Sequence, residues 1–279
     1  MRENSYDIRP VSGFSLPSWK DIWDYRELLQ FLVWRDVKVR YKQTAIGVGW
    51  AVLQPLSMMV VFAVFFGGLA NIPSDGIPYP VFAYTALLPW QLFSRAILES
   101  TNSLVVDQRL ITRVYFPRII VPSASVLAAI IDFFIAGILL VALMFFYGIL
   151  PTWHIVYFPV FIFLMLVTAL GVGYWLSALN LEYRDVMYAV PFINQLWFFM
   201  TPIVYPSSLV PDKWQFLYGL NPMVSVIEGC RWSLLGQGAG PSPMLWVSMA
   251  TGFFIFITGA AWFRWRERTF VDAVGSGGR

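Results

Sequence analysis

The sequence has 279 residues, of which 58% are hydrophobic and 13% are charged, and its formal net charge is +3. Soluble domains carry about 25% charged residues, so a chain of this composition cannot cover a soluble core, and the class of soluble enzymes is excluded. The single cysteine, Cys230, and the single histidine, His154, exclude a disulfide scaffold and a metal site built from either residue type. The composition indicates a polytopic membrane protein.

Residues 18–42 are predicted to form an amphipathic helix after a polar tail, 1–17, which lacks the apolar stretch of a cleavable signal peptide. Ser18 and Asp21 resemble a helix capping box. Apolar residues recur at helical spacing at Ile22, Tyr25, Leu28, Leu29, Leu32 and Val33. We expect the helix to lie at the cytoplasmic interface, its basic end near lipid phosphates; a plain orientation anchor is the alternative. The basic residues are Arg35, Lys38, Arg40 and Lys42.

Six apolar runs poor in charge are predicted to cross the bilayer, each as a helix of about 20 residues. They are 48–69, 78–94, 119–148, 155–179, 186–205 and 243–263. Turn formers near Pro151 divide an uncharged stretch that is too long for one crossing. Six crossings put both termini on one side. All Lys and Arg residues except Lys213 and Arg231 lie in segments on that side, so the positive-inside rule predicts cytoplasmic termini.

Two segments between the spans are longer or more apolar than a simple connection needs. The cytoplasmic loop 99–122 contains a predicted short helix at 104–114 that carries Asp107, Arg109 and Arg113, although a solvated loop is the alternative. The external segment 206–243 is too apolar for a free loop and too rich in proline for a span. We predict short re-entrant helices there, which are tolerated where protein buries their backbone ends. The internal loop 180–185 is a second candidate contact for a cytoplasmic partner.

A search for chemistry finds one acid in a span and no nucleotide-binding signature. A P-loop has the pattern GxxxxGK[ST], and the dipeptide Gly-Lys occurs nowhere in the chain, so this polypeptide does not bind ATP through a P-loop. Asp132 lies within the third span, where an acid is a candidate functional residue. Arg95 is its predicted counter-ion. Pairing within the bundle and a direct role in transport both remain open for Asp132.

The chain is rich in aromatic residues, with 24 Phe, 13 Trp and 13 Tyr, and several do not lie at span ends. Aromatic faces make broad contacts that depend weakly on the orientation of the partner, which suits a polymer of sugar rings that must slide. Lipid-facing packing is the alternative for each residue. The candidates are Trp50, Tyr84, Trp90, Trp197, Phe198 and Phe199.

Six motifs follow one another along the chain. They are RDVKVRYKQTAIGVGW at 35–50 with LQPL at 53–56, LPW at 88–90, LITRVYFPR at 110–118, LEYRDV at 181–186, TPIVYP at 201–206 and LNP at 220–222. Together they resemble the motifs of type-2 ABC transporter permeases that export polysaccharides, a group that includes O-antigen, capsule and teichoic acid permeases. The resemblance extends over about residues 25–265.

This resemblance implies a homodimer of six-span subunits, with a permease domain at 43–265 and a cytoplasmic tail at 266–279. Two separate cytoplasmic P-loop ATPase subunits would bind ATP and Mg²⁺, so this chain is expected to be no enzyme, to bind no cofactor and to have no nucleic-acid partner. Family substrates are polyprenyl-pyrophosphate-linked glycans, exported across the plasma membrane, which in bacteria is the inner membrane. An exporter of drugs or lipids, or a membrane glycosyltransferase or acyltransferase, is the alternative.

The resemblance also implies roles for individual residues. The aromatic candidates would line the glycan path, and the basic end of the interfacial helix would bind the lipid pyrophosphate at the cytoplasmic entrance, through Arg35, Lys38, Arg40 and Lys42. Contacts that couple the permease to the ATPase are expected at Asp107, Arg109, Arg113, Phe116, Glu182, Arg184 and Asp185.

Overall fold

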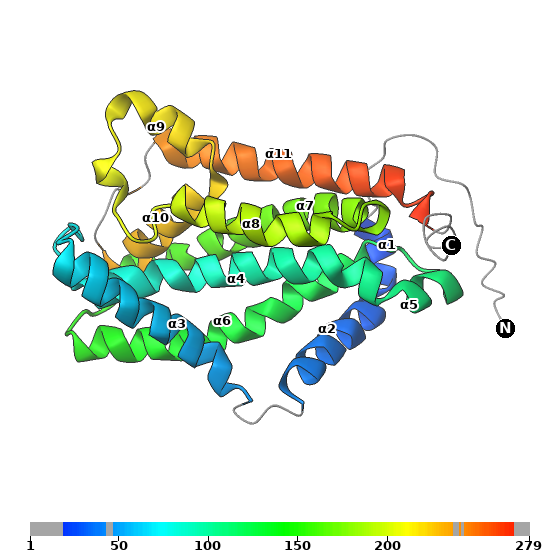
Figure 1. Ribbon diagram of the computed structural model, residues 1–279, viewed down its shortest axis with the longest axis horizontal. Coiled ribbons are helices and arrows are strands. Elements are labelled where there is room, and N and C mark those ends of the chain that lie inside the picture. The colour runs from blue at the N-terminus through cyan, green and yellow to red at the C-terminus, as the bar shows by residue number, and fades with distance from the viewer. Residues whose placement is uncertain (1–18, 43–46, 237–239, 241–242, 271–279) are drawn as a thin grey trace.

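The computed structural model describes residues 19–42, 47–236, 240 and 243–270, so the predicted tail 1–17 and most of the tail 266–279 lie outside the described residues. All regular secondary structure in the described part is helical, and the helices form an elongated bundle (Figure 1). The elements are α1 Trp19–Asp24, α2 Arg26–Tyr41, α3 Gly49–Phe62, η1 Ala63–Leu69, α4 Tyr79–Val106, α5 Gln108–Arg113, α6 Ile120–Phe146, η2 Trp153–Tyr157, α7 Phe158–Glu182, α8 Val186–Phe199, η3 Ser207–Leu209, α9 Asp212–Gly219, α10 Pro222–Leu235 and α11 Pro243–Arg266.

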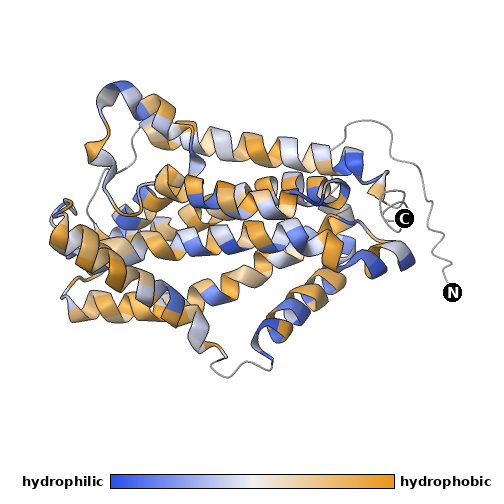
Figure 2. Cartoon of the chain, in the orientation of Figure 1, coloured by the Kyte–Doolittle hydropathy of each residue, from blue (hydrophilic) through white to orange (hydrophobic). Residues whose placement is uncertain are grey.

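Among the described residues, five helices are long and apolar enough to cross a membrane, and they correspond to the first four predicted spans and the last. These are α3 with its π-helical continuation η1, then α4, α6, α7 with η2, and α11. Figure 2 shows apolar residues along these helices, whereas hydrophilic residues gather on α2, on α5 and at the C-terminal end of α11. Figure 1 places α1, α5 and that end of α11 together at one end of the bundle. The described part of the chain thus begins and ends on the same side.

The second span was predicted to end at residue 94, and that boundary is wrong. Helix α4 continues to Val106, although it carries Arg95 and Glu99. Both charged side chains form ion pairs inside the bundle, so their charge does not end the helix. In the most apolar 18-residue stretch of α4, 78% of the residues are buried within the subunit, against 11% in that of α3 with η1. The bundle is therefore built around α4, and α3 lies at its periphery.

The predicted fifth span differs most from the structure. Helix α8 has 14 residues, about 21 Å at 1.5 Å per residue, and it is too short to count among the five spans. It ends before Pro202, and residues 201–205 are irregular. Buried side chains satisfy carbonyl oxygens of this segment: Tyr79 Oη donates to Val204 at 2.8 Å, and Arg231 Nη2 donates to Ile203 at 2.9 Å. Helices α4 and α10 therefore hold the irregular end of α8.

Short helices are present in the segment 206–243, as predicted, and α10 is the most buried of them. All its residues except Trp232 are buried. Arg231, which is 2% exposed, pairs with Glu228 at 3.1 Å and lies over the Phe82 ring of α4 at 3.6 Å. A buried guanidinium is tolerated only when it is paired and hydrogen-bonded, and here three different elements supply those contacts.

Glycine allows α7 and α11 to approach closely. A Cβ atom on Gly171 would lie 2.6 Å from the Cα atom of Phe256, which is backbone that cannot move aside. We expect Gly171→Ala to destabilise the subunit by about 1–3 kcal/mol because it overpacks this contact. Gly137 of α6 is the matched control, since a Cβ atom there would meet nothing within 4 Å. Gly137→Ala should leave stability unchanged or slightly raised in the same denaturation experiment; equal losses for both variants would contradict the close packing.

Candidate functional site

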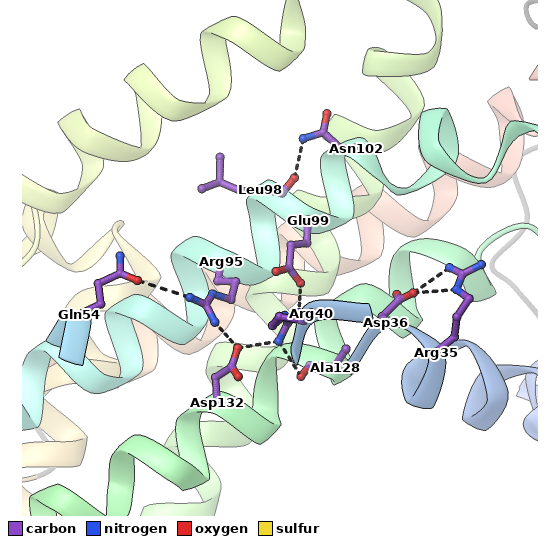
Figure 3. A network of polar contacts seen from close by, with 10 residues as sticks. All are labelled: Arg35, Asp36, Arg40, Gln54, Arg95, Leu98, Glu99, Asn102, Ala128 and Asp132. Atoms are coloured by element: carbon purple, nitrogen blue, oxygen red, sulfur yellow. Dashed lines mark hydrogen bonds and ion pairs between the residues drawn. The ribbon is translucent and has the colours of Figure 1, made fainter. Parts of the chain in front are cut away.

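A cluster of four charged residues joins α2, α4 and α6 inside the bundle (Figure 3). Arg40 Nη1 donates to Asp132 Oδ2 at 2.6 Å, and Arg95 Nη1 donates to the same oxygen. The second terminal nitrogen of Arg40 donates to Glu99. The predicted ion pair between Asp132 and Arg95 is thus present. Sequence reasoning missed the partnership with Arg40, because that residue comes from the interfacial helix, 92 positions away.

Helical spacing explains how two arginines meet two acids at this place. Arg95 and Glu99 are four residues apart on α4, so their side chains lie on the same face of that helix. On α6, Asp132 lies one turn beyond Ala128, whose carbonyl oxygen accepts a further bond from Arg40 at 3.3 Å. Arg40 reaches across both helices from the end of α2. The cluster balances two positive charges with two negative ones and fastens α2 to the bundle.

A small pocket with both apolar and polar lining residues lies beside this cluster, between α3, α4 and α6. Asp132 and Arg95 line it together with Gln54 and Gln91, and Arg95 Nη2 lies 3.5 Å from Gln54 Oε1. The other carboxylate oxygen of Asp132, Oδ1, is buried and has no hydrogen-bond partner among the described residues. A water molecule held by the polar residues of this pocket would satisfy that oxygen.

A second ion pair joins the interfacial helix to the connection between α4 and α5. Arg35 Nη1 and Nη2 donate to the two carboxylate oxygens of Asp107, each at 2.7 Å, and the guanidinium also binds Asp36. This is the forked geometry in which arginine binds carboxylates most strongly. Hydrogen bonding to Asp107 raises the pKa of Arg35 above its already high ordinary value. Arg35 is therefore charged at every working pH.

The residues predicted to couple the permease to an ATPase lie at one end of the bundle, on α5 and at the end of α7 (Figure 1). Their surroundings differ. Arg109, Arg113, Arg184 and Asp185 are exposed, and Glu182 pairs with Arg266 at 3.1 Å. Phe116 is buried in an apolar cluster, where it supports the end of the bundle. Tyr115 is 74% exposed beside it, a surface residue that sequence reasoning passed over although it lies inside one of the motifs.

The predicted apolar face of α2 packs against the protein. Leu32 is 1% exposed and lies in the same cluster as Ile111 and Phe263, and Figure 1 shows α2 running obliquely along the bundle. A second apolar set, with Phe31 and Trp34 more than 60% exposed, points outward. Among the four basic residues predicted at the entrance, Lys38 and Lys42 are exposed, whereas Arg35 and Arg40 are held in the ion pairs described above.

The six candidate aromatic residues divide by burial. Tyr84 and Trp90 are at most 4% exposed, and Phe198 is buried, so these three rings belong to the core of the subunit. Trp197 is partly buried, and its Nε1 donates to Asn221 at 2.8 Å. The exposed rings are those of Trp50, at 55%, and Phe199, at 59%.

A helical bundle with five apolar spans, buried ion pairs and a polar end defines a multi-pass membrane protein. The sequence profile of the ABC-2 type transporter matches residues 27–235, and the chain belongs to this family of transporter membrane subunits. Over 212 residues it is 34% identical to the O-antigen export system permease protein RfbA of Myxococcus xanthus, covering 75% of this chain and 80% of that one. A protein of the same name from Klebsiella pneumoniae is 28% identical, covering 88% and 94%. The polysialic acid transport protein KpsM of Escherichia coli is 24% identical, covering 88% and 95%.

Proposed function

We propose that the chain is the permease subunit of an exporter for a cell-surface polysaccharide of the O-antigen or capsule type, carried on a polyprenyl pyrophosphate. The observation that carries the proposal is the 34% identity to an O-antigen export permease across 80% of that protein. The chain contains no Gly-Lys pair and hence no P-loop. In this proposal a separate cytoplasmic subunit binds ATP and Mg²⁺, and this chain supplies the path.

The proposed topology has six crossings and cytoplasmic termini. Helix α8 and the irregular residues 201–205 together make the fifth crossing, since irregular backbone at membrane depth is tolerated where protein buries it. The polar bonds from Tyr79 and Arg231 to this segment support that reading. The end of the bundle that carries α5 and the end of α11 is rich in Arg, and the positive-inside rule makes it cytoplasmic. The membrane is the plasma membrane of the cell, the inner membrane in bacteria.

The transporter is proposed to be a homodimer with two ATPase subunits. Helices pack about 8–10 Å apart, so one bundle built tightly around α4 leaves no room for a hydrated glycan. The path must therefore lie between two copies. The peripheral position of α3 and its continuation η1, with exposed Val60, Val64 and Phe65, supports a role for this span where two bundles meet.

The experiment that tests the function compares cells with and without this chain. If the proposal is correct, cells lacking it accumulate lipid-linked glycan on the cytoplasmic side, and the purified protein carries a P-loop ATPase and crosslinks as a dimer. Loss of glycan synthesis in place of accumulation would indicate a glycosyltransferase or acyltransferase. Normal surface glycan together with altered drug or lipid export would indicate another cargo of the same family.

At the entrance, exposed Lys38 and Lys42 are proposed to attract the lipid pyrophosphate by charge, while Arg35 and Arg40 hold α2 in place for them. Charge attraction at an exposed site weakens with ionic strength. The two exposed rings among the six candidates, Trp50 and Phe199, are the proposed contacts of the sliding glycan, together with the partly buried ring of Trp197.

The aromatic contacts can be tested by chain length. We expect Trp50→Ala to slow the export of long glycans by about tenfold while binding of the lipid-linked substrate is retained, because a ring contact contributes about 0.5–1.5 kcal/mol at each step. Trp246→Ala is the matched control, since Trp246 is 67% exposed but belongs to α11, on the other side of the bundle in Figure 1. If both variants export long glycans at the same rate, Trp50 does not contact the glycan and is a lipid-facing residue.

A further inference from the structure

Helix α2 contacts the bundle through arginines near both ends of its C-terminal half, and each arginine reaches a different functional region. Arg40 binds the intramembrane cluster through Asp132 and Glu99. Arg35 binds Asp107, 72 positions away, with one nitrogen on each carboxylate oxygen at 2.7 Å. Both side chains of the second pair are largely buried, at 31% and 11% exposure. The interfacial helix therefore connects the membrane cluster to the connection between α4 and α5.

Asp107 occupies a special place in that connection. It is the residue at which α4 ends and α5 begins, with φ −94° and ψ 22°. Its carbonyl oxygen accepts the backbone N–H groups of Leu110 and Ile111 at 2.9 and 3.1 Å, which begin the first turn of α5. A residue that ends one helix and starts the next determines the angle between them. Arg35 therefore binds the residue that sets the angle between α4 and α5.

The ion pair between Arg35 and Asp107 also limits which residues near α5 are available to bind an ATPase. Both carboxylate oxygens of Asp107 are already bonded to Arg35, so Asp107 is occupied within the subunit. Arg109 and Arg113, on α5 itself, are exposed. Leu32 of α2 and Ile111 of α5 belong to one buried apolar cluster, so both helices are anchored in the same apolar core at this end of the bundle.

We infer that Arg35 is a positioning residue of the transport cycle: its forked bond to Asp107 ties α2 to α5, so that a displacement of α5 is carried along α2 to Arg40 and its membrane partners. This inference rests on the proposed function, in which an ATPase displaces α5. Asp107 acts within the subunit and does not contact the ATPase.

The test exchanges the two charges in the complex of permease and ATPase, reconstituted in lipid vesicles. We expect Arg35→Asp to lower glycan export by about tenfold or more, since it opposes two acids, while ATP hydrolysis and the amount of bound ATPase stay near wild type. Asp107→Arg should behave in the same way. The double variant R35D/D107R should recover export to within about threefold of wild type, because the pair is restored with its charges exchanged.

Two further variants separate positioning from folding. Arg35→Lys keeps the charge but loses the fork, and we expect export between those of wild type and Arg35→Asp. Arg26→Asp is the matched control for a charge reversal on α2, because Arg26 is exposed and contacts Trp23 of the neighbouring α1; its export should be normal. Export is measured per folded complex, so a loss of protein does not count as uncoupling.

Each outcome of these measurements either supports the inference or contradicts it. Export lost with ATP hydrolysis retained, and recovered in the exchanged pair, supports the inference. Normal export by Arg35→Asp overturns it, as does a loss of bound ATPase in Asp107→Arg that the exchanged pair leaves unrepaired, because that result makes Asp107 an ATPase contact. Failure of the wild-type complex to bind an ATPase or to export glycan contradicts the proposed function itself, which the variants do not address.

Discussion

Replacing Asp132 with alanine is expected to destabilise the folded subunit by about 3–5 kcal/mol, the typical loss when one member of a buried ion pair is removed. The carboxylate is 10% exposed and neutralises two guanidinium groups, those of Arg40 and Arg95. Without it, Glu99 alone faces both positive charges, and α2 loses one of its attachments to α6. Export should fall to background because, in the inferred coupling, α2 acts on the membrane helices through this cluster.

This prediction is checked by equilibrium unfolding of the purified subunit in mixed micelles, together with export in cells. Asp24→Ala is the control, because Asp24 is an exposed acid at the end of α1 and its loss should change stability by less than about 0.5 kcal/mol. Asp132→Asn keeps the shape but not the charge and should fall between the two. If the Asp132→Ala variant is as stable as wild type and exports glycan normally, the cluster is needed neither for stability nor for export.

Reversing the charge of Arg113 is expected to uncouple export from ATP hydrolysis while membrane insertion stays normal. Arg113 is exposed in the last turn of α5, and the subunit stability should therefore change little. A charged hydrogen bond to a partner contributes about 1.5–3 kcal/mol, which corresponds to roughly 10–100-fold in affinity for the ATPase. Arg113→Glu replaces that attraction with repulsion and should reduce export at least as much.

The measurement compares export, the membrane level of the permease and the amount of ATPase recovered with it. Arg268→Glu is a matched control, because Arg268 is exposed near the end of α11, at the same end of the bundle as α5 (Figure 1). That variant should export normally, which would show that a general loss of positive charge is harmless. Full export by Arg113→Glu would place the coupling contact elsewhere than on α5.

Several properties of this protein followed from local sequence alone. Four of the six predicted spans agree with α3 plus η1, α6, α7 and α11 to within a few residues at most ends, because a run of apolar residues is a property of neighbours in the chain. The helix predicted at 18–42 is present as two helices, α1 and α2, and that predicted at 104–114 is shorter, because residues 104–106 continue α4 and α5 begins at Gln108. Short helices after residue 206 were also predicted and are present. The order of the motifs indicated the transporter family to which the chain belongs.

The tertiary structure alone decided which charges meet and which apolar faces are inside. Arg40 was predicted to bind the lipid pyrophosphate and Asp107 to contact an ATPase; within the subunit, Arg40 pairs with Asp132 and Asp107 pairs with Arg35, partners that the sequence did not indicate. Tyr84 and Trp90 are aromatic residues of the kind predicted to line a sugar path, yet their side chains are packed in the core. Helix α4 passes through Arg95 and Glu99 because distant partners neutralise them. Such pairings join residues 37 to 92 positions apart, whereas hydropathy and helical periodicity report only on residues within a few turns of each other. The free energy of a buried charge depends on its partner, so it is decided only when the helices pack.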